Sequence, residues 1–196
     1  GIPVVSQGDT FSCVACSVTW IRQYEEKQTE NTISLSREFL AEVSNTESDG
    51  ATPSQVLNAA KKVGICESET WLKEQGKLSV ELELNASAHK IAGYAYITRL
   101  TPPSIYLALI RNPIMVGVDS YQGSEPHMMA AYDVEIRDGV LGLKTKNWWK
   151  MDAQDEGWIP FSDVRFAASI LSEKPKGKVR VPTFTVLKSK WSFLSY

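Results

Sequence analysis

The sequence contains few of the residues that bind metals or form disulfides. Its 196 residues include three cysteines, Cys13, Cys16 and Cys66, and two histidines, His89 and His127. An odd number of cysteines leaves at least one thiol unpaired within the chain, which excludes a disulfide framework. A structural zinc site needs about four ligands, and the Cys and His spacings do not supply them. We therefore expect no metal and no other cofactor, and the lack of paired cysteines favours a reducing, cytoplasmic compartment.

Long apolar runs and an excess of one charge are also missing. The longest apolar runs are much shorter than the span of about 18 residues that a membrane helix needs. Lys and Arg total 21 against 23 Asp and Glu, and this near balance argues against a nucleic-acid-binding protein. A content of 43% hydrophobic and 22% charged residues is that of a globular protein and excludes disorder. We expect one domain over 1–196 without a membrane or nucleic-acid partner.

The first half of the chain has the apolar spacing of helices. We expect three helices, over 13–26, 34–43 and 53–63. Ser34 and Ser36 are both candidate N-caps of the second helix. Thr52 suits the N-cap of the third helix, Pro53 its first position and Gly64 its end.

The second half has the shorter period of strands. We expect strands over 92–100, 114–118, 128–137, 140–146 and 158–161, and a short helix from 102 to 110. Asp138-Gly139 favours a type I′ hairpin, because both central residues of that turn need positive φ. Helices followed by strands predict an α+β fold with a helical lobe over about 7–88 and a β lobe over about 89–172. A basic C-terminal extension, 173–196, would follow them.

One set of residues could perform nucleophilic catalysis. Cys13 lies where a turn gives way to a helix, and the unpaired N–H groups and dipole there predict a lowered thiol pKa. Gln7 precedes it by six residues, and its amide is a neutral donor suited to a developing oxyanion. His127 begins a predicted strand and Asn147 ends another, so a base and a group that orients the base follow in order. The Cys13–Cys16 spacing is also that of thioredoxin-like motifs, but no βαβ pattern accompanies it. Cys66 is expected to be structural, and His89 to be a solvated loop residue.

Five segments resemble the papain family of cysteine peptidases, in the order in which that family carries them. They are QGDTFSCVA at 7–15, LSREFL at 35–40, DGATP at 49–53 with KVGI at 62–65, KNWW at 146–149, and DEGWI at 155–159. The resemblance covers roughly residues 4–166. It implies the papain-like two-lobed fold, with an active-site cleft between a helical lobe and a β-rich lobe.

The resemblance also implies roles for single residues. Cys13 would be the nucleophile, His127 its ion-pair partner and general acid, and Asn147 the group that orients the imidazole. Gln7 and the backbone N–H of Cys13 would bind the oxyanion, and Trp149 would shield the His–Asn hydrogen bond. Substrate would bind residues aligned with the family's cleft: Gly50, Ala51, Thr52, Pro53, Gly117, Met128 and Trp149. We expect a bulky apolar or aromatic substrate side chain beside Gly117 and Met128, with Glu125 able to admit a basic one.

Several positions depart from the family pattern. Thr10 stands where the family has a disulfide cysteine, and Ser48 lies near the partner position, which also lacks one. Val14 replaces the tryptophan after the nucleophile, and Cys16 replaces an aromatic residue that is usually buried. We therefore expect Cys16 to be a buried thiol with a raised pKa, leaving Cys13 as the nucleophile. The pattern is that of a divergent member.

The sequence thus predicts a cysteine endopeptidase that hydrolyses peptide bonds through an acyl-enzyme. Another papain-clan activity, amide hydrolysis or transpeptidation, is the alternative among enzymes. The alternative among proteins that are not enzymes is a non-catalytic papain-like binding module within a larger protein. The expected partner is a peptide or protein substrate. A partner chain or a propeptide could also meet the cleft or the basic extension.

Overall fold

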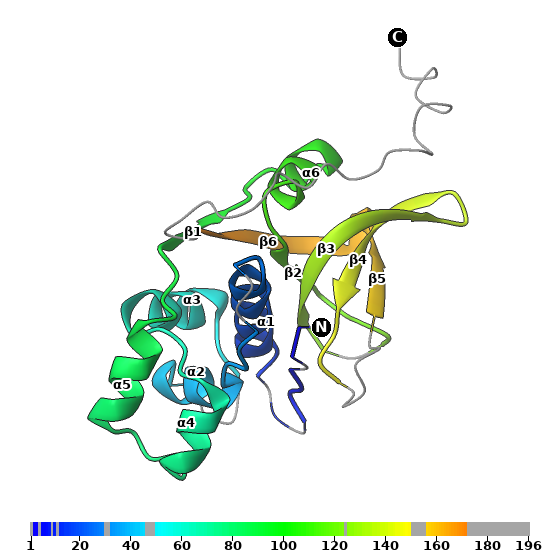
Figure 1. Cartoon of the computed structure of the whole chain (residues 1–196). Helices are drawn as coiled ribbons and strands as arrows, with labels where there is room; N and C mark the ends of the chain where they lie inside the picture. Colours follow the sequence, from blue (N-terminus) through cyan, green and yellow to red (C-terminus); the bar gives the residue numbers. More distant parts are fainter. Residues whose placement is uncertain are drawn as a thin grey trace.

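Helices fill the first half of the chain, and strands with one short helix among them fill the second, as the sequence predicts for an α+β fold (Figure 1). The computed structural model describes residues 2–3, 5–8, 10, 12–29, 32–45, 50–123, 125–149 and 156–171. Its helices are α1 (Cys13–Lys27), α2 (Arg37–Val43), α3 (Pro53–Lys62), α4 (Ser68–Lys73), α5 (Val80–Ser87) and α6 (Pro102–Leu109), with a 3-10 turn at Phe161–Asp163. Its strands are β1 (Gly93–Tyr96), β2 (Ile114–Val118), β3 (His127–Arg137), β4 (Val140–Lys146), β5 (Glu156–Pro160) and β6 (Val164–Leu171).

The six strands form one antiparallel sheet in the order β1-β6-β2-β3-β4-β5. β3 and β4 are joined by the predicted hairpin. Asp138 and Gly139 have φ of 49° and 80°, so both adopt the positive φ that a type I′ turn requires. The last described strand, β6, lies between β1 and β2, so the end of the described chain returns into the sheet.

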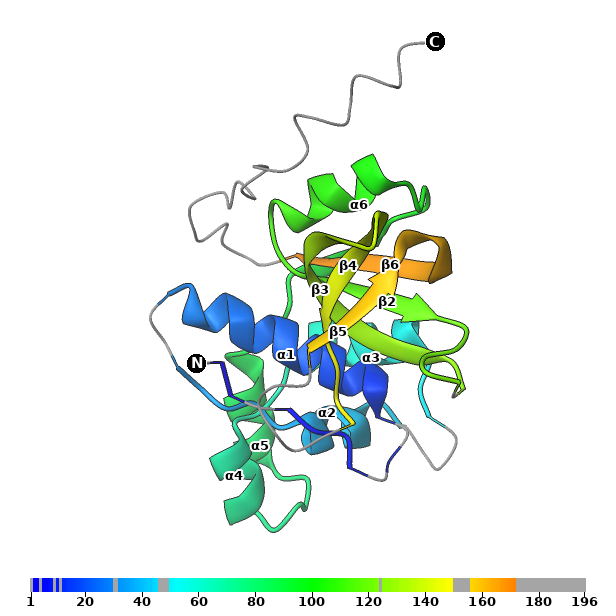
Figure 2. The same cartoon turned by 90° about the vertical axis from the view of Figure 1, so that its right-hand side faces the viewer.

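The sheet is covered on both faces, by α1 on one side and by α6 on the other (Figures 1 and 2). Alternate side chains of a strand point to opposite faces. Met115 of β2 therefore packs with the cluster around α1, whereas its neighbours Ile114 and Val116 pack with Ile105 of α6. Burial of every residue of β2 explains why its sequence is a continuous apolar run.

Capping residues set the helix boundaries that position the cleft. Thr52 accepts a hydrogen bond from the backbone N–H of Gln55, and the Gln55 side chain accepts one from Thr52, which forms a capping box at α3. Gly64 follows α3 with φ of +103°, and a Cβ there would lie 1.9 Å from a backbone oxygen of α5. The N-cap of α2 is Ser36 and not Ser34, so this helix begins three residues later than the start of its predicted range.

Some predicted boundaries are wrong and three elements were not predicted. β1 ends at Tyr96 instead of residue 100, because the chain turns toward α6 there, and β5 begins earlier than predicted, at Glu156. α4 has no buried residue, and so it has no apolar stripe to reveal it. The apolar residues of α5 include Val80, Leu82 and Leu84, which alternate like those of a strand. β6 was also missed.

His89 is not the solvated loop residue that the sequence suggested. Its side chain is 11% exposed, because the chain after α5 folds back onto the end of α1. Nδ1 lies 3.3 Å from a carboxylate oxygen of Glu26, and Nε2 lies 3.5 Å from one of Glu67. Both ring nitrogens therefore face acidic groups.

Three further predictions concern membrane spans, the C-terminal segment and the lobe boundary. Among the described residues, no helix is both long and apolar enough to cross a membrane. The predicted basic extension, 173–196, lies outside the described residues. The predicted lobe boundary falls between the end of α5 and the start of β1.

Candidate active site

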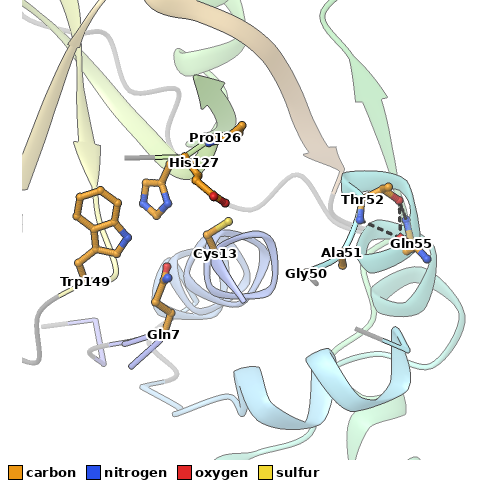
Figure 3. Close-up of a pocket in the computed structure, with 10 residues that line it drawn as sticks. Gln7, Cys13, Gly50, Ala51, Thr52, Gln55, Pro126, His127 and Trp149 are labelled. Atoms are coloured by element: carbon orange, nitrogen blue, oxygen red, sulfur yellow. Dashed lines mark hydrogen bonds between the residues drawn. The ribbon is translucent and has the colours of Figure 1, made fainter. Parts of the chain in front are cut away.

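Three elements bring the predicted catalytic residues into one region. Cys13 is the first residue of α1, His127 is the first residue of β3, and Asn147 directly follows β4. β3 pairs with β4, and the core around α1 includes side chains from the start of β3. Cys13 and His127 therefore line the same open cleft of about 660 Å³, and Figure 3 shows the imidazole beside the thiol.

A hydrogen bond to Asn147 fixes the imidazole of His127. Nε2 of His127 lies 2.7 Å from Oδ1 of Asn147, and the backbone N–H of Trp148 donates to the same oxygen at 2.8 Å. That N–H identifies the atom as an acceptor, so Nε2 must carry a proton. In the neutral ring, Nδ1 is then the nitrogen that can take up a proton. His127 and Asn147 are 5% and 6% exposed, so little water reaches this bond.

Two aromatic rings pack around the imidazole. The centroid of Trp149 lies 4.6 Å from that of His127, and the shielding role that the resemblance implies for this tryptophan stays a prediction. Tyr121, from the loop after β2, stacks on His127 with centroids 5.8 Å apart and an interplanar angle of 27°. Sequence reasoning missed Tyr121, because it lies in a short polar loop without a motif. The rings of Tyr121 and Trp149 also contact each other, with centroids 5.2 Å apart, so the three rings form one cluster that limits tilting of the imidazole.

Trp148 ties the loop after β4 to both α1 and β3. Its indole N–H lies 2.9 Å from the carbonyl oxygen of Met128 and 3.2 Å from Oγ of Ser17. The side chain is 1% exposed, so it is a core residue, whereas the next residue, Trp149, lines the cleft. This anchorage holds Asn147 in position behind His127.

The pKa of Cys13 corrects the sequence prediction. Position at the start of a helix predicts a lowered thiol pKa, but burial raises the pKa of the Cys13 thiol. Backbone N–H groups of Met128, Val14 and Cys13 itself lower it, and their effect is smaller than the loss of hydration. Cys13 therefore needs a neighbouring base to form a thiolate near neutral pH.

Gln7 lines the cleft, as predicted, and its side-chain amide already has one partner. Nε2 donates to the carbonyl oxygen of Thr10 at 3.0 Å. An amide nitrogen has two hydrogens, so a second N–H can still be donated. Oε1 of Gln7 is buried and accepts no hydrogen bond within the described residues.

The cleft contains some of the predicted substrate-binding residues and not others. Its lining consists of Gln7, Cys13, Gly50, Ala51, Thr52, Gln55, Glu125, Pro126, His127 and Trp149. Sequence reasoning missed Gln55, which the capping-box spacing after Thr52 could have indicated. It also missed Pro126, for which no signal was present.

Pro53, Gly117 and Met128 do not belong to this lining as far as the chain is described. The sequence predicts a bulky substrate side chain beside Gly117 and Met128. A Cβ placed on Gly117 would instead lie 3.1 Å from Cε of Met128 and 3.2 Å from Cβ of Phe166. The space beside Gly117 is therefore filled by these two side chains.

The other two thiols are unsuited to nucleophilic attack. Cys16 and Cys66 are both fully buried, and loss of hydration raises the pKa of each thiol to about 12. This confirms the prediction for Cys16. In the described part of the chain, no three His, Cys, Asp or Glu side chains are grouped in a way that could hold a metal ion.

Comparison with solved structures identifies the fold. No protein-family model matches the sequence, nor does any curated protein. Xylellain, a cysteine protease from Xylella fastidiosa, superposes with a TM-score of 0.75 at 16% identity over 87% of this chain and 83% of its own. Bromelain from Ananas comosus gives 0.70 at 16% identity over 87% and 93%. A Carica candamarcensis cysteine protease gives 0.69 at 16% identity over 88% and 93%. The chain therefore has the two-lobed α+β fold of the papain-like cysteine proteases.

Proposed function

We propose that this protein is a cysteine peptidase that cleaves peptide bonds through an acyl-enzyme on Cys13. The observation that carries the proposal is the hydrogen bond between His127 and Asn147, which makes Nδ1 a proton acceptor in the cleft that holds the Cys13 thiol. Similarity to papain-like cysteine proteases supports a peptidase. Substrate would be a peptide or protein segment lying in the cleft along Gly50, Ala51 and Thr52.

Acylation begins with transfer of the Cys13 thiol proton to Nδ1 of His127. The sulfur then attacks the carbonyl carbon of the scissile bond, and the π electrons move onto the carbonyl oxygen. The backbone N–H of Cys13 and the second N–H of Gln7 would stabilise this oxyanion. When the C–N bond breaks, His127 returns its proton to the leaving amine, and a thioester remains on Cys13.

Deacylation reverses the roles with water in place of the amine. His127 takes a proton from water, and the hydroxide attacks the thioester carbon. Collapse of the second tetrahedral intermediate releases the acid, and the sulfur recovers its proton from His127. Because burial opposes ionisation of Cys13, the thiolate would form only together with the imidazolium, which the Asn147 oxygen stabilises.

Covalent labelling tests the proposal directly. A peptidyl epoxide of the E-64 type should add one molecule to wild-type protein, and tandem mass spectrometry should place it on Cys13. Cys13→Ala should lose labelling and peptide turnover, with at most the residual catalysis that binding alone provides. Cys16→Ala is the matched control and should keep both, at a cost of about 1 kcal/mol of stability for a small buried group.

The same assay separates the alternatives. A protein that binds peptides but is never labelled would be a non-catalytic binding module, and the proposal would be wrong. Labelling at Cys13, together with turnover of a peptide substrate in which the acyl group passes to an added amine faster than to water, would indicate a transpeptidase. Labelling at Cys16 alone would show that the assignment of the nucleophile is wrong. The preference for apolar or aromatic side chains stays a prediction.

A further inference from the structure

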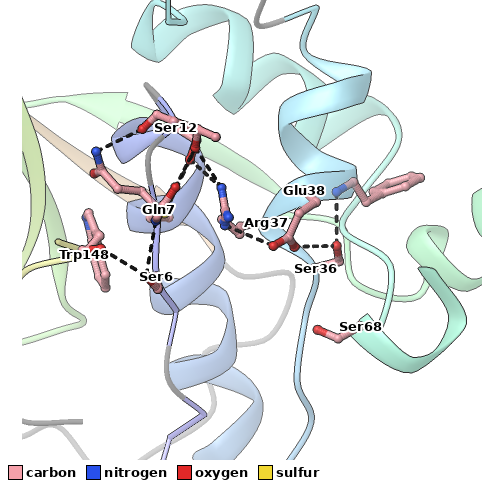
Figure 4. A network of polar contacts seen from close by, with 12 residues as sticks. Ser6, Gln7, Ser12, Ser36, Arg37, Glu38, Ser68 and Trp148 are labelled. Carbon is pink, nitrogen blue, oxygen red and sulfur yellow. Dashed lines mark hydrogen bonds and ion pairs between the residues drawn. The ribbon is translucent and has the colours of Figure 1, made fainter. Parts of the chain in front are cut away.

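Arg37, the first residue of α2, is bound to the segment 6–12 that leads into α1. Its Nη1 donates to Oγ1 of Thr10 at 3.0 Å and to Oγ of Ser12 at 2.8 Å. Figure 4 shows the guanidinium between Ser12 and Glu38, and its Nε lies 3.2 Å from a carboxylate oxygen of Glu38. The Arg37 side chain is only 17% exposed, and its hydrogen bond to Ser12 is partly buried, whereas Glu38 is half exposed to water.

The hydrogen bonds continue from Arg37 to the amide of Gln7. Oγ1 of Thr10 donates to the carbonyl oxygen of Gln7 at 2.7 Å, and Nε2 of Gln7 donates back to the carbonyl oxygen of Thr10 at 3.0 Å. On its other side, the backbone N–H of Gln7 donates to the carbonyl oxygen of Trp148 at 3.0 Å. Gln7 is therefore held between the loop that carries Asn147 on one side and Thr10, which Arg37 binds, on the other.

Arg37 also engages the residue that would ordinarily cap α1. Ser12 is the N-cap of α1, but its side chain makes no capping hydrogen bond. A serine at this position typically accepts from a first-turn N–H. Here its oxygen accepts from Arg37 and lies 2.7 Å from Oγ1 of Thr10. The first-turn N–H groups of Cys13 and Val14 are left to face the Cys13 sulfur, where they lower the thiol pKa.

We infer that Arg37 is a positioning residue, which holds Gln7 and the start of α1 in the arrangement needed to stabilise the oxyanion. The inference rests on the proposed function. Arg37 does not line the cleft described above, and it acts through Thr10 and Ser12. Two hydrogen bonds, both made by Thr10, separate the Arg37 charge from the Gln7 amide, so its effect on catalysis would come from geometry.

The test compares Arg37→Met with Arg22→Met. Both arginines are mostly buried and paired with carboxylates, but Arg22 binds Glu25 and Glu26 near the other end of α1. Both variants should lose stability. Only Arg37→Met should lower kcat for a peptide substrate, by about tenfold to a hundredfold with little change in KM, as expected for a displaced oxyanion donor. Only Arg37→Met should speed amide hydrogen exchange in 5–12.

A second pair of variants tests the route through Ser12. Ser12→Ala should lower kcat less than Arg37→Met, and the double variant should be no worse than Arg37→Met alone, because both changes break the same contact. If Arg37→Met fails to fold, the loss of kcat in Ser12→Ala still tests the inference. Additive losses in kcat, or an unchanged kcat in Arg37→Met, would overturn the inference.

Hydrogen exchange separates this inference from the proposed function, because it needs no activity. An inactive, unlabelled wild-type protein would refute the peptidase. Faster exchange of 5–12 in Arg37→Met but not in Arg22→Met would then still support the contact between Arg37 and this segment. Equal exchange in the two variants would refute that contact whatever the activity.

Discussion

Cys13 combines two opposing influences on a single sulfur atom. Its position at the start of α1 gives it backbone N–H groups that favour a thiolate, while burial under the β lobe favours the neutral thiol and prevails. A nucleophile with this balance is protected from indiscriminate oxidation and alkylation, because the thiolate is the reactive form. Its reactivity then depends on His127, whose proton-accepting nitrogen is set by Asn147.

Removal of the base should expose the raised pKa of Cys13. In His127→Ala, we expect the rate of alkylation by iodoacetamide to rise with pH and to reach half its maximum above 9.0, the ordinary value for this thiol. The sign follows from burial, which disfavours the charged form and so moves ionisation to higher pH. Mass spectrometry of Cys13 at a series of pH values measures the rate.

The wild-type protein is the control for this measurement. Its alkylation should already proceed at neutral pH, because proton transfer to His127 supplies the thiolate. A midpoint below 9.0 in His127→Ala would contradict the balance described for Cys13.

Single residues differ in how far the sequence reveals them. Cys13 and His127 could be found because they lie at the starts of a helix and a strand that have sequence signals, and Gln7 from its offset from Cys13, whereas Trp149 follows from the resemblance to the papain family. Arg37 could not be found in this way. Its partners lie 25 and 27 residues away along the chain, and a lone arginine at the start of a helix indicates nothing about what it will bind.

At the scale of elements, the capping box of α3 supports one wall of the cleft. Thr52→Ala should lower the free energy of unfolding by about 1 kcal/mol, because the N–H of Gln55 loses its acceptor. It should also raise KM for peptides, since Gly50 and Ala51 immediately precede this cap and line the cleft. Urea unfolding and steady-state kinetics measure the two effects.

Thr101→Ala is a matched control. Thr101 also precedes a proline and also caps a helix, α6, but its side chain makes no capping hydrogen bond. Thr101→Ala should leave the free energy of unfolding and KM for peptides nearly unchanged. An equal loss of stability in the two variants would mean that the capping box does not account for the effect of Thr52.

The elements that could be predicted share a local signal. α3 has a threonine cap, a proline and a terminal glycine, and β3 and β4 have a turn that needs positive φ. α4 lacks such a pattern, and α5, although Ser79 caps it, has few buried side chains and apolar residues that alternate like those of a strand. The place of β6 inside the sheet depends on contacts with β1 and β2, which are distant in sequence.

At the scale of the whole molecule, the buried thiol of Cys16 should lower the free energy of unfolding as pH rises above 9. Its pKa is raised from 9.0 to about 12 by burial. Below pH 9 both folded and unfolded chains keep this proton, and its contribution to stability is complete. As pH rises further, the unfolded chain loses the proton first, so the free energy of unfolding should fall by about 1.4 kcal/mol per pH unit.

Comparison with Cys16→Ala isolates this effect from other groups that titrate in the same range. Cys66, also with a pKa of about 12, is present in both proteins and cancels. Urea unfolding from pH 7 to 11 should give a steeper loss of stability for wild type than for Cys16→Ala. If the free energy of unfolding falls equally with pH in the two proteins, Cys16 has the same pKa in the folded and the unfolded chain.

The overall architecture could be predicted because helical spacing dominates the first half of the chain and strand spacing the second, apart from the short helix α6. What the sequence does not reveal is the seam between the two lobes. There Trp148 binds both Ser17 of α1 and Met128 of β3, and Gln7 binds Trp148. These contacts join four separate segments, and none of them has a local signature.

The hairpin of β3 and β4 offers a place to attach the protein without touching its chemistry. β3 has His127 at its first residue, and its eleven residues span about 35 Å at about 3.4 Å per residue. The tip, Asp138-Gly139, is exposed, and a Cβ placed on Gly139 would meet nothing within 4 Å. A dye, a surface tether or an affinity handle joined there would stand at the far end of the strand, and the mouth of the cleft would stay open.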